Sequence, residues 1–270
     1  MEHAGNGTLM DFDWAFFVER IVNPGAPYIN ALGRTVSMAV LAMFLGLLIG
    51  LVVGFGRLSR YGLVRSACGF YVWLIRGIPV LVLLVMLFSG MAAAGLFRFT
   101  DLEFAGIKLT ASFQAAVIGL AIHEGAYMAE IVRNGIQSVA RGQIEAARSL
   151  GMSPWLVAWR IVIPQATRVV MPPFGNDFNH MLKTTSLASV IGVPEIFQLT
   201  EAMSATTFKT FELLTVVALN YLVLTAIWNT IQGVIETRLR AHEIDRPVRS
   251  WWQSFVVYLT PSTNSSERRS

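Results

Sequence analysis

Long apolar runs separated by short polar turns constrain the fold of this chain more than any other feature of its sequence. The first run, residues 31–55, is about 25 residues long, enough to cross a hydrocarbon core of roughly 30 Å with some tilt. Further runs cover about residues 64–90, 112–132 and 211–233, and another begins near Trp155. With 54% hydrophobic and only 14% charged residues, the chain has too few polar residues to cover a soluble globule of its size. The sequence therefore predicts an all-α membrane protein with five transmembrane helices.

Arginines mark one side of this predicted membrane protein. They cluster in the turn after the first run and again after the last run: Arg57, Arg60, Arg65, Arg238, Arg240, Arg246 and Arg249. Because short loops rich in lysine and arginine stay on the cytoplasmic side, both places are predicted to be cytoplasmic. An odd number of spans then puts the N-terminus outside and the C-terminus inside. The net charge of +4 follows this orientation and does not indicate nucleic-acid binding.

The apolar runs also divide the chain into three parts. Residues 1–30 form an external or interfacial segment, in which Asn23-Pro24-Gly25 and Pro27 are expected to break any helix. Residues 31–240 form the transmembrane domain, and residues 241–270 form a cytoplasmic tail. The N-terminal segment lacks a basic stretch before an apolar core, so no cleavable signal peptide is visible and the first span is expected to be the targeting signal.

One polar stretch between the apolar runs predicts a short surface helix. Residues 145–151 read Glu-Ala-Ala-Arg-Ser-Leu-Gly, and Gly151 is a natural helix terminator. Ala146, Ala147 and Leu150 are expected on one side of this helix, where the two alanines let another backbone come close.

A second helix is predicted directly after this stretch. Ser153 suits the N-cap and Pro154 suits the first helical position. Ile161 follows Gly151 after nine intervening residues, and Pro164 comes three positions later. A tight helix-turn-helix is therefore expected at the membrane surface.

This spacing resembles the EAA motif of ABC-transporter inner-membrane permeases, which reads EAA, three residues, G, nine residues and then I-x-L-P. Here the spacing fits throughout, with Ile163 where the family usually has leucine. Residues 71–79, 126–136 and 183–187 are similar to permeases of polar amino-acid importers, the histidine/glutamate/glutamine/arginine group. Together the similar stretches cover most of residues 31–240.

The resemblance implies a type I ABC importer permease fold in the inner membrane of a bacterium. In that family the short helix, here about residues 143–151, is the coupling helix, which docks in a groove of the cytoplasmic ATPase and passes its movement to the spans. The coupling residues carried over to this chain are Glu145, Ala146, Ala147, Gly151, Ile161 and Pro164.

The resemblance also implies partners and a mode of transport. The partners are a cytoplasmic ABC ATPase dimer, a second permease chain, identical or homologous, and a periplasmic or lipid-anchored amino-acid-binding protein. ATP and magnesium would bind to the ATPase, and no cofactor is expected on this chain. Transport would proceed by alternating access.

Polar residues on one face of the third span predict part of a substrate path. His123, Tyr127, Glu130 and Asn134 are spaced to stack on one helical face, with Glu124 on its flank. Such a stripe cannot face lipid. Glu130 is predicted to join helices, because an arginine follows it at i+3. His123 and Glu124, at a place where the family varies, either join helices or contact the substrate.

The fourth span is polar for a membrane helix. Prolines at 164, 172 and 173 are expected to interrupt it, and polar side chains then fall on one face. This pattern is typical of a broken helix that lines a water-filled path, and a plain contact between helices is the alternative interpretation. The predicted substrate path consists of His123, Glu124, Tyr127, Asn176, Asn179, His180 and Lys183.

Two features of the first two spans concern packing. Gly46, Gly50 and Gly54 repeat every four residues, a stripe that lets another helix pack closely. Arg76 is costly within the second span unless it faces protein, water or a carboxylate. Arg76 could form a structural salt bridge or contact the substrate, and the predicted substrate path does not include it. Pro79 is expected to bend this span.

The sequence does not indicate an enzyme. None of Lys108, Lys183 and Lys209 follows a glycine, so there is no Walker A pair and the energy source must be another chain. The single cysteine, Cys68, permits no internal disulfide, and no cysteine/histidine cluster is present to hold a metal.

Two alternative functions remain open. An ATP-independent secondary transporter or channel would relay protons through His123, Glu124 and Asp177. An intramembrane enzyme would use His123-Glu124 or His180, but no HExxH, GxSxG or paired-aspartate pattern supports it. The sequence does not indicate which amino acid is carried or whether the partner permease is identical.

Overall fold

A computed structural model describes residues 12–104 and 106–240, and the predicted tail at 241–270 lies outside these ranges. The elements in chain order are α1 (Trp14–Val22), α2 (Gly25–Arg57), α3 (Gly62–Gly77), α4 (Val80–Val85), the π-helix η1 (Met86–Gly90), α5 (Met91–Ala93), β1 (Leu102–Phe104), β2 (Ile107–Leu109), α6 (Ala111–Gln137), α7 (Arg141–Ser149), α8 (Pro154–Val157), the π-helix η2 (Ala158–Val162), α9 (Ile163–Thr184), the 3-10 helix η3 (Thr185–Ile191), α10 (Ile196–Thr207) and α11 (Thr210–Arg240). The described part of the chain is mostly helical, as the sequence predicts.

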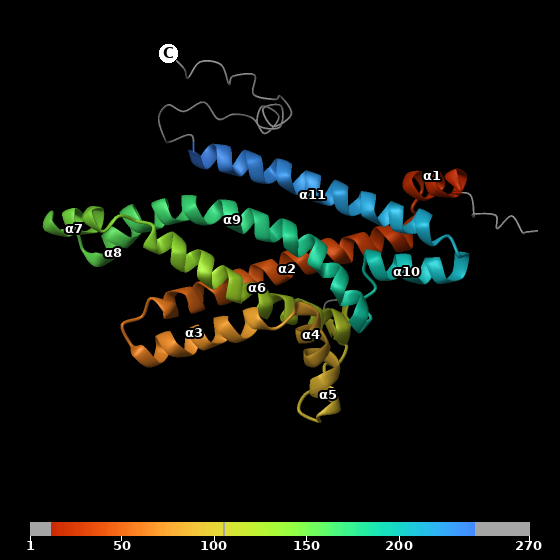
Figure 1. The fold of residues 1–270 in the computed structure, drawn as a ribbon, viewed down its shortest axis with the longest axis horizontal. Coiled ribbons are helices and arrows are strands. Elements are labelled where there is room, and N and C mark those ends of the chain that lie inside the picture. The colour runs from red at the N-terminus through yellow and green to blue at the C-terminus, as the bar shows by residue number, and fades with distance from the viewer. Residues whose placement is uncertain (1–11, 105, 241–270) are drawn as a thin grey trace, which may run out of the picture.

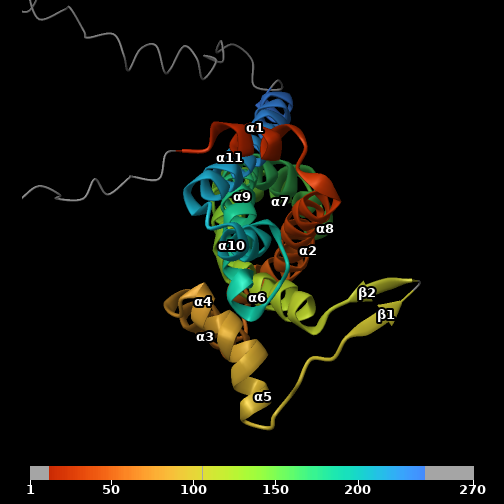
Figure 2. The same cartoon turned by 90° about the vertical axis from the view of Figure 1, so that its right-hand side faces the viewer.

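The long helices run lengthwise through the molecule (Figure 1). α2, α6 and α11 run from the end that carries α1 and α10 toward the end that carries α7 and α8, and α3 and α9 run in the opposite direction. In the end-on view the β1–β2 hairpin and α5 project away from this bundle (Figure 2). The α2–α3 turn, α7 and the last turn of α11 therefore share one end of the molecule.

Three of the described helices, α2, α6 and α11, are long and apolar enough to cross a membrane. The bent pair formed by α3 and the helix from Val80 to Ala93 makes a fourth span if it is counted as one. α9 is 22 residues long but is not among them. Its polar side chains lower its hydropathy, so the predicted count of five spans is reached only if a polar helix is included.

The second predicted span is bent by 103° between α3 and α4. Ile78 and Pro79 lie at the bend in extended conformation, with ψ angles of 128° and 135°. A residue before proline is pushed out of the helical region, which ends α3 at Gly77. The bend predicted at Pro79 is confirmed, and it is sharp enough to turn the chain sideways.

The predicted interruption of the fourth span is wrong, because α9 continues through Pro172 and Pro173. Side chains of α11 brace this segment: Trp228 Nε1 donates to the Gly175 carbonyl at 2.7 Å, and Gln232 Nε2 lies 3.4 Å from the Pro172 carbonyl. Neighbouring helices that supply donors let a membrane helix tolerate proline. The proline at 164 follows the π-helix η2 directly, and the helical chain continues past it without a break.

The helix break predicted at Asn23-Pro24-Gly25 is present, whereas Pro27 breaks no helix. α1 forms before the predicted breakers, and α2 begins at Gly25, with Pro27 in its first turn. Asp13 caps α1 by accepting from the Phe16 amide at 2.9 Å, and it pairs with Lys209 beside α11. The lysine and this amide hold the pKa of Asp13 below its usual range.

The loop between the second and third predicted spans carries the β1–β2 hairpin. Asp101, before β1, accepts from the Ala111 amide at 2.9 Å and pairs with Lys108 at 3.2 Å. The hydrogen bond from the Ala111 amide lowers the pKa of Asp101 most, and the contact with Lys108 lowers it further. Asp101 thereby connects the hairpin to the start of α6.

The glycine stripe of α2 lies against α6, as predicted. A Cβ atom added to Gly46 would lie 2.9 Å from Glu124 Cβ, and one added to Gly54 would lie 3.0 Å from the Ala129 carbonyl oxygen. At Gly50 the added atom would overlap Met128. The two helices therefore touch at backbone distance along the stripe, and this is the most extensive contact between any two of the described elements.

This contact predicts that alanine is not tolerated at the middle of the stripe. Gly50→Ala should lower the stability of the chain by roughly 1–3 kcal/mol, the usual cost of overpacking. Gly33→Ala is a matched change on the same helix, where an added Cβ meets nothing within 4 Å, and it should be neutral or slightly stabilising. Thermal unfolding of the full chain in detergent measures the difference, and equal unfolding of the two variants would contradict the close contact.

Candidate functional site

The predicted surface helix is present as α7 and ends as the sequence indicates. Gly151 has a φ of 79°, the left-handed conformation that glycine adopts without strain. The Met152 amide donates to the Ala147 carbonyl at 3.1 Å, and the Gly151 amide donates to the Arg148 carbonyl at 2.9 Å. This pair of bonds is a Schellman motif, which satisfies the last carbonyls of the helix and turns the chain back.

Only one of the two alanines of α7 packs against the protein. Ala147 is 4% exposed, whereas Ala146 and Leu150, expected on the same side, are exposed. Glu145 is also exposed and is two positions from Ala147, so the two side chains point to nearly opposite sides of the helix. α7 therefore rests on its own chain through Ala147 and presents Glu145 and Ala146 outward.

α7 is joined to the start of the fourth long helix. Ser153 caps α8 by accepting from the Leu156 amide at 3.3 Å, and Pro154 occupies the first helical turn, as predicted. Ile161 lies in η2, just before Pro164 in the first turn of α9. Gln165 Nε2 donates to Gln143 Oε1 at 2.6 Å and so connects α9 directly to α7. The six predicted coupling residues thus occupy one continuous helix-turn-helix.

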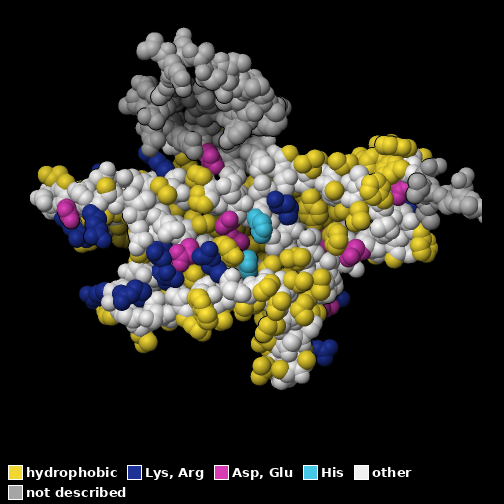
Figure 3. All heavy atoms as spheres, in the orientation of Figure 1, with side chains coloured by type: hydrophobic (Ala, Val, Ile, Leu, Met, Phe, Trp, Pro, Cys, Tyr) yellow, Lys and Arg dark blue, Asp and Glu magenta, His cyan; other side chains and the backbone are white. Residues whose placement is uncertain are grey.

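A second group of polar residues lies near the centre of the bundle. The rings of His123 and Tyr127 on α6 are 5.0 Å apart, and the Arg76 guanidinium lies 5.0 Å from the centre of the Tyr127 ring. Figure 3 shows histidine and acidic side chains gathered at the middle of the visible face. Among residues 12–104 and 106–240 Arg76 forms no ion pair within salt-bridge distance. Its guanidinium lies over an aromatic ring and within electrostatic range of Asp177 on α9.

Glu130 joins two helices, as predicted. It pairs with Arg57 of α2 and with Arg133 of its own helix, both at 3.1 Å. The contact with Arg57 could not be read from the sequence, because the two residues belong to different spans. Together with the glycine stripe, this ion pair fixes the α7 end of α6 against α2.

Glu124 is buried in the contact between α2 and α6. It is 4% exposed, and its Oε1 atom has no hydrogen-bond partner among the described residues. Neither His180 nor Lys183, the partners considered from the sequence, forms an ion pair with it in the described part of the chain. Asp177 of α9 lies within electrostatic range of Glu124. A buried carboxylate without a partner is costly, and such groups in membrane helices mark functional sites.

The remaining predicted path residues lie on one face of α9, where two of them contact α11. Asn179 Nδ2 donates to Asn229 Oδ1 at 2.9 Å, and Asn176 Oδ1 accepts from Gln232 Nε2 at 3.3 Å. These two asparagines thus face α11, as the helix-contact interpretation has it. His180 and Lys183 are exposed, and the His180 Nδ1 atom lies 3.1 Å from the Thr184 hydroxyl.

The sequence did not predict that Tyr71 lies near Glu124. The Tyr71 hydroxyl on α3 donates to the Ile122 carbonyl at 2.6 Å, two residues before Glu124. A Cβ on Gly125 would lie 3.0 Å from this hydroxyl oxygen, so the absence of a side chain there lets the tyrosine reach the α6 backbone. In the part of the chain that the structure describes, no group of three or more histidine, cysteine, aspartate or glutamate side chains could hold a metal.

Comparison with known proteins relates this arrangement to membrane transporters. The family described as "Binding-protein-dependent transport system inner membrane component" matches residues 46–241. A probable amino-acid ABC transporter permease protein of Bacillus subtilis is 33% identical over 227 residues, which are 83% of this chain and 95% of the relative. An arginine transport system permease protein of Corynebacterium glutamicum is 39% identical over 201 residues, 72% of this chain and 62% of that relative.

A solved structure shows the same likeness in three dimensions. It is described as an amino acid ABC transporter with histidines. The two folds superpose with a TM-score of 0.73 at 32% sequence identity, over 85% of this chain and 100% of the other.

Proposed function

Because the chain belongs to the family of binding-protein-dependent transport system inner membrane components, as a permease of the polar amino-acid ABC importer type, we propose that it forms the translocation path of an ATP-driven importer in a bacterial inner membrane. The path opens to either side by alternating access. α7 couples it to a separate ATPase, and the permease itself catalyses no reaction.

The observation that carries this proposal is the outward face of α7. Glu145 and Ala146 are exposed on a short helix that is fixed to the bundle through Ala147 and through the bond between Gln143 and Gln165. A partner that pushes on this face moves α9 directly. A polar helix presented to solvent and rigidly joined to a span is what mechanical coupling requires.

The proposed membrane topology counts five crossings, with α9 as the fourth. α9 need not meet lipid with its polar residues, because its asparagines bond to α11 and Asp177 lies within electrostatic range of Glu124 on α6. Lysine and arginine side chains gather over the α2–α3 turn and the α7 end of the molecule (Figure 3). This distribution supports the proposal that this end is cytoplasmic, with the N-terminus outside and the C-terminus inside.

Three partners complete the proposed importer. A cytoplasmic ATPase dimer, which holds the ATP and magnesium, contacts α7. A second permease chain, identical or homologous, closes the path, since five helices make only part of a wall. An external amino-acid-binding protein delivers the substrate to the α10 end.

Within the path, Glu124 is proposed to contact the substrate. Its unpaired Oε1 atom, with a histidine and a tyrosine on the same helix, would receive a cationic side chain such as that of arginine, lysine or histidine. The relative that transports arginine supports this substrate class. The alternative, proton relay by a secondary transporter, would use the same carboxylate without ATP.

Reversing the charge of Glu145 tests coupling. Glu145→Lys should lower substrate-stimulated ATP hydrolysis in liposomes by at least about tenfold, because a like charge or an unmatched charge in an interface costs several kcal/mol. Glu201→Lys makes the same change at an exposed position of α10, at the other end of the molecule, and should leave copurification with the ATPase unchanged. Undiminished stimulation by Glu145→Lys would rule out the coupling role.

Reporter fusions test the topology. A reporter placed after Arg249 should be cytoplasmic and one placed near Asn6 should be periplasmic, because the spans between them are odd in number. Both signals on the same side would contradict five crossings.

Replacing the carboxylate at 124 tests the substrate contact. Glu124→Gln keeps the size and should spare assembly, but it should lower uptake of a cationic amino acid about 10- to 100-fold, the loss expected for a hydrogen bond between charged groups. Copurification with the ATPase controls for folding. Normal uptake by this variant, or a neutral or acidic natural substrate, would show that Glu124 only joins helices.

A further inference from the structure

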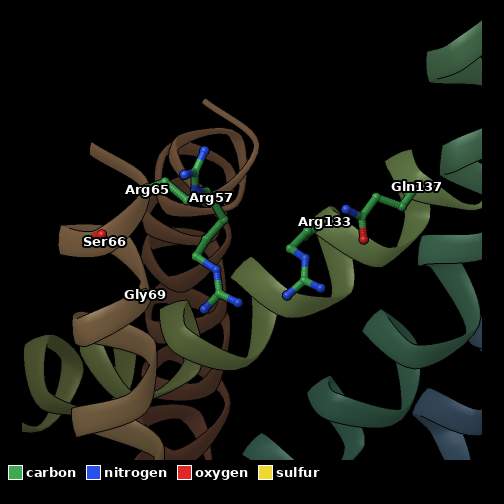
Figure 4. A pocket seen from close by; sticks show the side chains of 6 residues that line it. All are labelled: Arg57, Arg65, Ser66, Gly69, Arg133 and Gln137. Carbon is green, nitrogen blue, oxygen red and sulfur yellow. The ribbon is translucent and has the colours of Figure 1, made fainter. Parts of the chain in front are cut away.

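A basic cavity lies at the α7 end of the bundle, apart from the coupling helix and the substrate path. It is bordered by α2, α3 and α6 through Arg57, Arg65, Ser66, Gly69, Arg133 and Gln137. Its volume is about 420 Å³. Figure 4 shows the side chains of Arg57 and Arg133 extending into the same space, with Arg65 beside them.

The charges in this cavity are not balanced. Among the described residues, Glu130 is the carboxylate that pairs with these arginines. Its Oε1 atom lies 3.1 Å from Arg57 Nη1, and its Oε2 atom lies 3.1 Å from Arg133 Nη1. Arg65 donates instead to the Ser59 carbonyl at 3.3 Å. Three positive charges thus face one negative charge. The cavity carries a surplus positive charge that favours an anion.

The donors in the cavity suit a phosphate group. A guanidinium has five N–H donors in a planar fork, and only one nitrogen of Arg57 and one of Arg133 is taken up by the ion pairs with Glu130. The Ser66 hydroxyl and the Gln137 amide add neutral donors. Gly69 leaves the space open, since a Cβ there would lie 3.8 Å from Arg57 Nη1.

An apolar surface continues from the cavity along α3. Ser66, Gly69, Phe70 and Trp73 share one face of this helix by their spacing. The Phe70 and Trp73 side chains are 59% and 70% exposed, and their rings are 5.7 Å apart. Acyl chains would lie along this face, whereas a free phosphate would gain nothing from it.

We propose that this cavity binds the phosphate headgroup of an anionic phospholipid, such as phosphatidylglycerol, with its acyl chains along the Phe70 and Trp73 face of α3. Its placement in the inner leaflet rests on the topology proposed above. The headgroup binds the same arginines that pair with Glu130. Gln137, which also borders the cavity, is the last residue of α6 before the turn to α7. A bound lipid therefore contacts the helix end from which the coupling helix begins.

The test uses the full chain in detergent and compares its affinity for phosphatidylglycerol, phosphatidylcholine and soluble glycerol 3-phosphate by native mass spectrometry. The chain should prefer phosphatidylglycerol to both. Arg65→Gln should weaken that binding about fivefold, the contribution of one basic residue near an anionic membrane surface. Arg60→Gln removes the same charge from the neighbouring turn, where Arg60 bonds to Tyr61 outside the cavity, and should leave the affinity unchanged.

A second variant separates the cavity from its charge. Gly69→Leu fills the space without removing an arginine and favours the helix, so it should weaken phosphatidylglycerol binding in a folded chain. Equal effects of Arg60→Gln and Arg65→Gln, or full binding by Gly69→Leu, would overturn the proposed site. Glycerol 3-phosphate binding as tightly as the lipid would overturn the lipid in favour of a soluble phosphate. None of these readouts requires transport or ATP hydrolysis, so their outcome is separate from that of the proposed importer function.

Discussion

The close contact between α2 and α6 is the constraint on which the rest of the structure depends. Apolar side chains gain little by leaving lipid for one another, so membrane helices associate where small residues let backbones touch. The glycines at 46, 50 and 54 provide that surface, and α6 lies on it along its length. α6 places several of the groups discussed above: Glu124 lies at its middle, Glu130 and Arg133 lie near its end, and α7 follows directly after it.

Burial of charge along this contact separates two kinds of carboxylate. Glu130 lies near the basic end of the molecule and is neutralised by arginines from two helices. Glu124 lies deeper, and its Oε1 atom has no such partner in the part of the chain that the structure describes. Glu130 is therefore explained as an ion pair that joins α6 to α2. Glu124 is costly unless another group compensates its charge, and this cost is the reason for proposing that it contacts a cationic substrate.

Local signals in the sequence predicted local structure well. The glycine stripe, the terminator Gly151, the N-cap Ser153 and the bend at Pro79 were all found where the pattern placed them. Contacts between distant segments were not predictable in the same way. The donors from α11 that brace Pro172, and the pairing of Arg57 with Glu130, depend on which helices become neighbours. Which alanine of α7 packs against the chain was not predictable for the same reason, because only the packing decides that Ala147 and not Ala146 is buried.

The central claim is that this chain moves an amino acid only when a separate ATPase supplies the energy. The most direct measurement is uptake of labelled amino acid into proteoliposomes that contain the chain with its ATPase and binding protein, with ATP, a non-hydrolysable analogue or a proton gradient as the only energy source. Uptake should occur with ATP and should be absent with the analogue and with the gradient alone. Uptake by the chain alone, driven by a proton gradient without ATP, would contradict the account and identify a secondary transporter.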